Sequence, residues 1–316
     1  MIDLIGDIHG HATELKNLLE KLGYAPKDGT YTHPERTVVF VGDFIDRGPN
    51  IPETLRIVKS MVDSENAVAI MGNHEYNALC FHFKDPNGGH LRKHSIDNLV
   101  QHYETILQFK KDHKQYEAYL EWFKTLPLYY ETESFKAVHA CWDANNIAFL
   151  RKTLVNDRLT DDLIYQSVKK GTELYTAIDQ TLKGKEMKLP AGVSFADKDE
   201  KIRTETRIKW WENPAHMTYH SISVKPIDAL PHDPVDVSKI GSSAHYPEDD
   251  KHVFFGHYWL TGDPAPNKAN VCCLDYSVAK NGKLVAYRLN GESVLTKENM
   301  VSAECLRKQG LAYPTP

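Results

Sequence analysis

Residues 1–10 read MIDLIGDIHG, and the same plan recurs in TVVFVGDFIDRG (residues 37–48) and AVAIMGNHE (residues 67–75). In each segment an apolar run ends in a glycine, and polar side chains follow it. Each run has the length and the residue types of a buried strand. The glycine predicts a sharp turn at the end of that strand. These segments therefore predict a sheet whose strand ends carry polar loops.

Helical segments separate these predicted strands. Four leucines between residues 15 and 22 recur with helical spacing, and Gly23 follows them. Pro52 begins a second helix of the same kind. Strands that alternate with helices predict a parallel or mostly parallel sheet covered by helices. Ligands of such sheets bind beyond the carboxyl ends of the strands, so we expect the polar loops to converge.

The rest of the chain is less regular. Residues 83–114 are polar and rich in histidine, and no element is predicted there. A hairpin turn at Asn281-Gly282 should join the last two strands. Further elements are predicted as a helix at 115–124 and strands near 128 and at 135–139, 253–255, 271–274 and 284–289. The sequence thus predicts a single domain over residues 1–316, with an insertion or cap at about 151–250.

Composition limits the classes of function. The chain has 316 residues, 41% of them hydrophobic and 26% charged, as in ordinary globular proteins. Its net charge of -5 does not indicate a nucleic-acid partner. The five cysteines are odd in number and include the adjacent Cys272 and Cys273, which argues against a disulfide framework. With no visible signal peptide or membrane-length apolar run, we expect a soluble, cytoplasmic protein without a membrane partner.

The polar loops offer groups that bind metals. Asp7 and His9 are two residues apart, so their side chains point the same way in an extended segment. Carboxylates, imidazoles and an amide oxygen form a ligand set suited to Mn²⁺, Fe or Zn²⁺. Taken singly, Asp7 fits a turn, Asn73 a helix N-cap, and Asp46-Arg47 a surface ion pair. Their combination at successive strand ends favours a metal site.

The motifs GDIHG, GDFIDRG and GNHE resemble the signature of the calcineurin-like metallophosphoesterases. The DRG form is similar to the branch that contains phosphoprotein phosphatases and bacterial diadenosine tetraphosphatases. Val138-His139 and Phe255-Gly256-His257 resemble the fourth and fifth motifs of the family. The resemblance implies an α/β fold, a four-layer αββα sandwich with an inserted cap region. It also implies two divalent metal ions, for which Mn²⁺ is the first choice and Fe or Zn²⁺ the alternatives.

The resemblance also implies a role for individual residues. The implied metal ligands are Asp7, His9, Asp43, Asn73, His139 and His257. The first two would bind one metal, Asp43 would bridge both, and the other three would complete the second site. Arg47 would bind the substrate phosphate with its planar guanidinium. His74 would act at the leaving-group oxygen, and Asp46 would orient its ring.

The segment RTETRIKWW, residues 203–211, has two interpretations. In the first it is a substrate lip, with Arg203 or Arg207 on a phosphate and Trp210 or Trp211 stacked on a nucleobase. In the second, the tryptophans pack the insertion onto the main domain. We favour the second interpretation and keep Arg207 as a candidate phosphate-binding residue.

The expected reaction is hydrolysis of phosphomonoesters or nucleotide-type phosphoanhydrides by a metal-bound hydroxide. The substrate would be a phosphorylated small molecule, a nucleotide or a phosphoprotein. Alternatives are a dinucleoside tetraphosphatase, a Ser/Thr-type protein phosphatase, and a catalytically silent metal- or nucleotide-binding module. Cys141 and Trp142 replace glycines common after the fourth motif, and Trp259 replaces a second histidine after the fifth. The two tryptophans should crowd the second ester arm of a diester, which favours monoesters.

Overall fold

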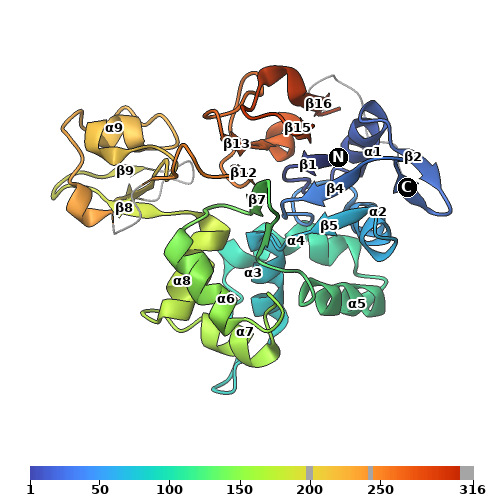
Figure 1. Ribbon diagram of the computed structural model, residues 1–316. Coiled ribbons are helices and arrows are strands. Elements are labelled where there is room, and N and C mark those ends of the chain that lie inside the picture. Colours follow the sequence, from blue (N-terminus) through green and yellow to red (C-terminus); the bar gives the residue numbers. More distant parts are fainter. Residues whose placement is uncertain (197–201, 241–244, 307–316) are drawn as a thin grey trace.

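The computed structural model describes residues 1–196, 202–240 and 245–306. Two sheets form the centre of the molecule (Figure 1). The larger sheet has the order β14-β15-β1-β4-β5, with β16 paired to β15, and the smaller has the order β13-β12-β7-β6. The larger sheet consists of β1 (Ile2–Ile5), β4 (Thr37–Phe40), β5 (Ala67–Ala69), β14 (Asp275–Tyr276), β15 (Lys283–Leu289) and β16 (Met300–Glu304). The smaller consists of β6 (Tyr129–Glu131), β7 (Phe135–Val138), β12 (His252–Phe255) and β13 (Val271–Cys273).

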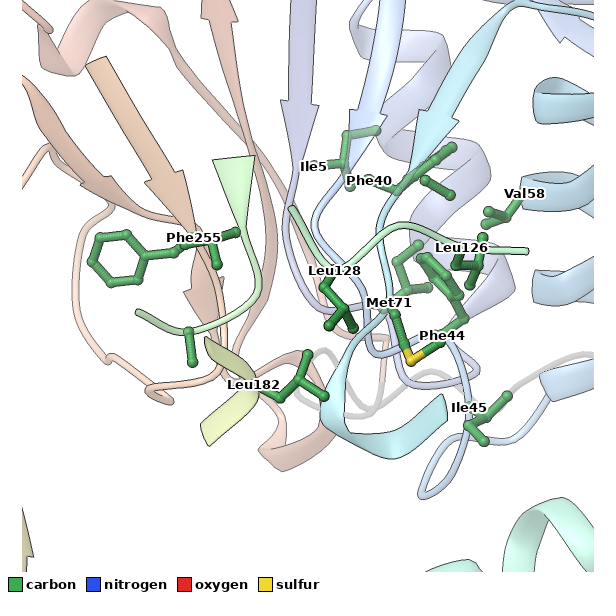
Figure 2. Packing of buried hydrophobic residues seen from close by; sticks show 14 of the residues in the cluster. Ile5, Phe40, Phe44, Ile45, Val58, Met71, Leu126, Leu128, Leu182 and Phe255 are labelled. Atoms are coloured by element: carbon green, nitrogen blue, oxygen red, sulfur yellow. The ribbon is translucent and has the colours of Figure 1, made fainter. Parts of the chain in front are cut away.

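Alternation along the strands buries both faces of the sheets. Leu4 and Val39 lie in the core between the sheets, whereas their neighbours Ile5 and Phe40 lie in the core under the helices. Successive side chains of a strand point to opposite faces, so a strand that is apolar throughout must be covered on both sides. Figure 2 shows Ile5 and Phe40 packed with Val58 on the helix side. The expected four-layer αββα arrangement is confirmed.

The larger sheet is mixed rather than mostly parallel. β1, β4 and β5 are parallel, but β15 runs antiparallel to β1 and to β14. The predicted hairpin is partly wrong, because residues 271–273 pair with β12 in the smaller sheet. The chain then crosses to the larger sheet, where β14 and β15 form the hairpin. A 3-10 helix, η3 (Val278–Lys280), precedes Asn281-Gly282 in its loop.

Eight α-helices surround the sheets among the residues described before the cap lobe. They are α1 (Ala12–Lys21), α2 (Ile51–Asp63), α3 (Asn73–His82), α4 (Ile96–Gln108), α5 (His113–Phe123), α6 (Ala144–Thr153), α7 (Asp161–Ser167) and α8 (Glu173–Lys183). The sequence did not predict α4. Its apolar residues Ile96 and Val100 are 80% and 70% exposed, while its buried residues are the polar His102 and Thr105. The hydrophobic periodicity of α4 therefore marks its outer face. None of the described helices is long and apolar enough to span a bilayer.

Residues 186–196 and 202–240 form a small lobe, here called the cap lobe, beside the smaller sheet (Figure 1). It contains β8 (Glu186–Lys188), β9 (Phe195–Ala196), β10 (Ile202–Arg203), β11 (Glu205–Arg207), η1 (Pro214–His216), α9 (Tyr219–Ile222) and η2 (Val237–Lys239). Trp210 and Trp211 are buried and anchor it. The Trp210 indole donates to the Ala140 carbonyl at 2.9 Å, and Trp211 packs on Phe255. The tryptophans thus pack the insertion onto the main domain, as the second interpretation of this segment predicted. The remaining elements are the hairpin β2 (Ala25–Lys27) and β3 (Thr30–Thr32), and η4 (Lys297–Asn299).

Candidate metal centre

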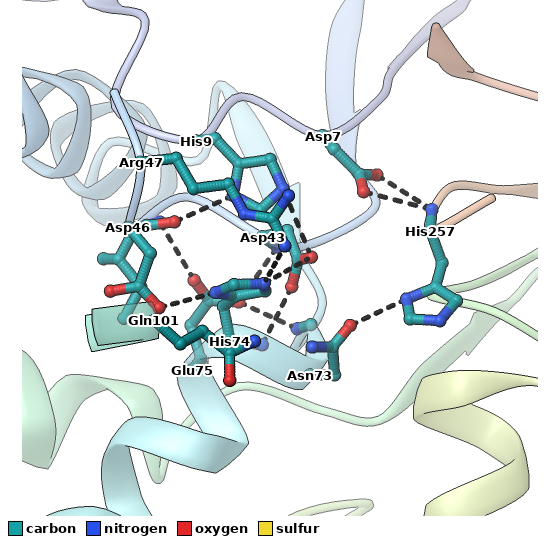
Figure 3. Close-up of polar contacts among 12 residues, drawn as sticks. Asp7, His9, Asp43, Asp46, Arg47, Asn73, His74, Glu75, Gln101 and His257 are labelled. Carbon is teal, nitrogen blue, oxygen red and sulfur yellow. Dashed lines mark hydrogen bonds and ion pairs between the residues drawn. The ribbon is translucent and has the colours of Figure 1, made fainter. Parts of the chain in front are cut away.

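The loops after β1, β4, β5, β7 and β12 converge at one end of the sheets, and the expected site residues meet there (Figure 3). Asp43 lies at the centre of this cluster. Its Oδ2 is 3.6 Å from His9 Nε2, and its Oδ1 is 3.4 Å from His139 Nε2. Each carboxylate oxygen therefore faces a different imidazole. This is the geometry required of a carboxylate that bridges two cations.

Backbone carbonyls fix the tautomers of both imidazoles. His9 Nδ1 lies 2.9 Å from the Ile45 carbonyl, and His139 Nδ1 lies 2.8 Å from the Val41 carbonyl. A carbonyl only accepts, so Nδ1 carries the proton in each ring. In the neutral rings, the Nε2 atoms that face Asp43 then present lone pairs. A hydrogen bond of this kind on the far ring nitrogen is typical of metal-binding histidines.

Asn73 and His257 complete the side occupied by His139. Asn73 Oδ1 is 3.1 Å from His139 Nε2 and 2.7 Å from His257 Nδ1. In the described part of the chain, the buried nitrogens His9 Nε2 and His257 Nε2 have no hydrogen-bond partner. A buried polar atom without a partner is costly, and a cation at the centre would satisfy His9 Nε2. His257 faces the centre with its other nitrogen, Nδ1, which lies against Asn73 Oδ1. The donor set of carboxylate, imidazole and amide oxygen therefore fits divalent metal ions.

Asp7 and His74 depart from the simplest expectation. The oxygens of Asp7 accept the backbone N–H of His257, at 3.0 Å for the shorter contact. The two groups of ligand atoms within metal-binding range are His9–Asp43–His74 and Asp43–His139–His257, so Asp7 belongs to neither. His74 Nε2 approaches Asp43 Oδ2 at 3.9 Å instead. The structure thus brings Asp7 beside the centre without turning its carboxylate into it.

The charges at this site are crowded. Burial raises the pKa of Asp7 well above its usual value, and the neighbouring carboxylates of Asp275 and Asp43 raise it further. Burial alone would raise the pKa of Asp43, but His139 and His74 hold it well below its usual range. Burial would lower the pKa of His139, but Asp43 raises it. Crowded carboxylates beside imidazole lone pairs form a site that cations would stabilise.

The remaining imidazoles of the centre favour their neutral forms. Burial lowers the pKa of His9, and the charge of Arg47 lowers it further. Burial likewise lowers the pKa of His257, with Arg207 as the next cause. A neutral imidazole is the form that binds a metal. Arg207 of the cap lobe therefore lies close enough to the centre to affect its electrostatics.

Glu75, which the sequence analysis did not single out, holds the loop after β4 in place. Its Oε2 accepts the backbone N–H groups of Asp43 at 2.9 Å and Gly72 at 3.0 Å. Its Oε1 accepts those of Phe44 at 2.8 Å and Ile45 at 3.3 Å. Glu75 is fully buried, and burial together with the charge of Asp43 raises its pKa to about 7. One side chain therefore fixes four backbone donors of the two metal-site loops.

The backbone of the site is strained. Six non-glycine residues of the centre and its wall have positive φ, namely His9, Asp43, Asp46, Arg47, His257 and Trp259. Non-glycine residues rarely adopt positive φ, and those that do concentrate where function requires an unusual backbone. Gly72 and Gly256 permit close approach, because a Cβ there would lie 2.2 Å from Asp43 Oδ1 and 1.9 Å from Asp7 Oδ1. The glycines of the motifs thus leave room for the carboxylates.

Asp46 orients His74, and a second histidine orients Asp46. Asp46 Oδ2 lies 2.5 Å from His74 Nδ1, while Oδ1 accepts from Thr105 Oγ1 at 2.5 Å and lies 2.7 Å from His102 Nδ1. The other nitrogen of His102 lies 2.7 Å from the Tyr116 hydroxyl. Burial would raise the pKa of Asp46, but these hydrogen bonds lower it. His102 and Thr105 come from the unpredicted helix α4, and no sequence motif marks them.

Arg47 reaches the centre from the loop after β4, which also carries Asp43 and Asp46. One of its guanidinium nitrogens lies 3.2 Å from His74 Nε2, and its Cζ lies 3.9 Å from the centroid of the Trp259 ring. Arg47 and Trp259 line a cleft of about 1380 Å³, together with Asp43, His74 and His257. Arg203 and Arg207 of the cap lobe also line this cleft.

The residues that follow the fourth motif face away from this chemistry. Trp142 is buried against Tyr129 and Lys136, so the expectation that it crowds the ester is wrong. Cys141 lies in the hydrophobic core, and burial raises the pKa of its thiol. A protonated thiol is a poor metal ligand, which supports a structural role for Cys141.

The sequence profile of the calcineurin-like phosphoesterases matches residues 1–258. The chain belongs to this family. The suspected resemblance is thereby confirmed. A solved structure with a similar fold is a cold-active protein tyrosine phosphatase, with a TM-score of 0.51 and 17% identity over 95% of this chain and 78% of that one.

Curated relatives are named as asymmetrical bis(5'-nucleosyl)-tetraphosphatases PrpE. The protein from Oceanobacillus iheyensis is 35% identical over 140 residues, which is 44% of this chain and 54% of that protein. The protein from Halalkalibacterium halodurans is 38% identical over 128 residues, which is 37% of this chain and 50% of that protein. The matches thus span about half the length of these relatives.

Replacing Glu75 should test its role as the anchor of the loop. In Glu75→Gln an amide NH₂ faces two backbone donors, so we expect the free energy of unfolding of the metal-free protein to fall by about 3 kcal/mol. Urea denaturation would measure it, with the exposed Glu117→Gln as a control that changes stability by less than about 0.5 kcal/mol. A loss for Glu75→Gln as small as that of the control would contradict the assignment.

Proposed function

We propose that the chain is a two-metal-dependent phosphoric ester hydrolase that acts on phosphomonoesters or nucleotide-type phosphoanhydrides. The observation that carries the proposal is the position of Asp43, whose two oxygens face two imidazole lone pairs. Membership of the calcineurin-like phosphoesterase family supports it. A silent binding module would not require the buried contacts of His74 with Asp46 and Arg47, which favour an enzyme.

We assign the metal ligands from the residues that converge. Asp43 would bridge the ions, His9 and Asp7 would hold the first, and Asn73, His139 and His257 the second. Asp7 would need to turn its carboxylate from the His257 amide toward the first ion. Mn²⁺ suits this mixed oxygen and nitrogen set, with Fe or Zn²⁺ as alternatives. Bound divalent ions would activate water and neutralise charge on the phosphoryl group.

Arg47 would bind the phosphate, and His74 would protonate the leaving group. His74 carries its proton on Nδ1, toward Asp46, while Arg47 donates to Nε2. When Arg47 turns to the phosphate, Nε2 is released to face the leaving oxygen. Nε2 would then take up a proton from solvent in the cleft and donate it to that oxygen, with Asp46 stabilising the imidazolium in between. Arg207, half-buried in the cleft wall, would add a second guanidinium for the phosphate.

A nucleotide substrate is the narrower proposal. The tetraphosphatase names of the relatives support it, as does a cleft larger than most small-molecule pockets. Activity on phosphoproteins is the alternative. We place the enzyme in the cytoplasm, since all five cysteines are buried thiols outside disulfides.

The bridging role of Asp43 can be tested by metal content. Asp43→Asn removes one of the two oxygens and the charge, so both ions should bind more weakly. We expect the purified variant to lose both metals and its Mn²⁺-dependent activity on p-nitrophenyl phosphate and diadenosine tetraphosphate. The exposed Asp249→Asn serves as control. Retention of both ions at a near-normal rate would overturn the bridging assignment, and an inactive wild-type protein would overturn the proposed function.

His74→Ala should slow turnover by about 10²–10⁴ while metal content is kept. The loss should be smaller for p-nitrophenyl phosphate than for an alkyl phosphate, because nitrophenolate leaves without a proton. Rates with both substrates, measured at the same free Mn²⁺, show whether the loss depends on the leaving group. An equal loss for both leaving groups would exclude the role of acid.

His102→Ala should reduce kcat by about tenfold, because Asp46 loses one charge-assisted hydrogen bond. The effect should vanish when Asp46 is already replaced by Ala, since His102 acts through it. A double-mutant cycle on kcat, with KM and metal content measured in parallel, tests this coupling. Additive losses in the two variants would mean that His102 has only a structural role.

A further inference from the structure

Trp259 is in contact with two cations. The Cζ of Arg47 lies 3.9 Å from the centroid of its ring, and the Nζ of Lys280 lies 3.5 Å from the same centroid. The Trp259 backbone is fixed, because its N–H donates to Asp275 Oδ2 at 2.7 Å. All three residues of this stack, Arg47, Trp259 and Lys280, line the cleft.

The stack runs outward from the metal centre. Arg47 is half-buried and touches His74, whereas Lys280 is exposed at the end of η3. Buried carboxylates, Asp43 first among them, offset the charge of Arg47 from the inner side. Lys280 is thus the outer cation of the pair, in a segment beyond the family match at residues 1–258.

Cation–π attraction alone does not favour this arrangement. A ring attracts one cation through its negative face, but a second cation beside the same ring is repelled by the first. A ligand with negative charge at both positions removes that repulsion. The cleft as a whole is not basic, since Asp97 and Glu104 of α4 also line it. The pairing of cations is therefore a local feature of the stack.

We propose that Lys280 forms a distal phosphate subsite, which binds the phosphate next to the one held by Arg47. The ligand is a chain of two or more phosphates, as in a nucleoside polyphosphate. The inference rests on the proposed function and narrows it to phosphoanhydrides. The two cations touch one ring, so neighbouring phosphates of a chain can contact both, whereas a monoester has no second phosphate for Lys280.

The test compares tripolyphosphate with a single phosphate. Competition against p-nitrophenyl phosphate at fixed free Mn²⁺ gives the inhibition constant of each anion, whether or not it is cleaved. We expect Lys280→Ala to weaken the binding of tripolyphosphate about tenfold, because one charge-assisted contact is lost. The binding of inorganic phosphate should weaken by less than about threefold. Lys280→Arg should restore most of the difference, and Lys297→Ala, an exposed lysine of η4, is the matched control.

Calorimetric titration of the same proteins with both anions provides a readout independent of turnover. The same tenfold change in preference is expected there. An equal loss for both anions would mean that Lys280 only supports Trp259 and Arg47, and an unchanged constant for tripolyphosphate would also overturn the subsite. If the wild-type protein hydrolyses p-nitrophenyl phosphate but Lys280→Ala keeps the wild-type preference for tripolyphosphate over inorganic phosphate, only this inference fails. A phosphopeptide that competes better than tripolyphosphate would likewise contradict it.

Discussion

The geometry of the centre depends on Glu75 and its four backbone hydrogen bonds. The loop after β4 carries Asp43, Asp46 and Arg47, all with positive φ, so it would not hold this shape unaided. Glu75 belongs to the first turn of α3, the helix that also supplies Asn73 and His74. One buried carboxylate thus ties the two loops together and fixes the bridging residue relative to the other ligands.

Electrostatics explain why the buried carboxylates and imidazoles of the centre would be stabilised by cations more than by their contacts with one another. Asp7, Asp43 and Asp275 are buried within Coulombic range, and burial raises the pKa of Asp7 and Asp275. The lowered pKa values of His9 and His257 favour their neutral forms, and His9 Nε2 has no hydrogen-bond partner among the described residues. Two divalent ions would remove both costs at once. In the proposed mechanism, Arg47 and His74 would contact the substrate, and Asp46 and His102 lie behind them.

The sequence predicted those parts of the fold that rest on local pattern. Glycine-ended apolar runs predicted β1, β4 and β5, and the position of the polar loops at the carboxyl ends of these strands predicted that they meet. It could not predict α4, because the buried residues of this helix are polar, whereas its apolar residues Ile96, Leu99 and Val100 are exposed. His102 was missed for the same reason, since its role arises from packing against Asp46. The side chains of Trp142 and Asp7 point according to tertiary contacts that no local pattern specifies. The placement of β13 in the smaller sheet and β14 in the larger sheet likewise depends on long-range pairing.

The central claim is that Asp43 bridges two metal ions held by the neighbouring histidines and Asn73. Anomalous diffraction at the manganese edge, from crystals soaked in Mn²⁺, tests it most directly. The account predicts two peaks, one on each side of the Asp43 carboxylate, with His9 at one and His139, His257 and Asn73 at the other. A single peak, or two peaks that do not share Asp43, would contradict it.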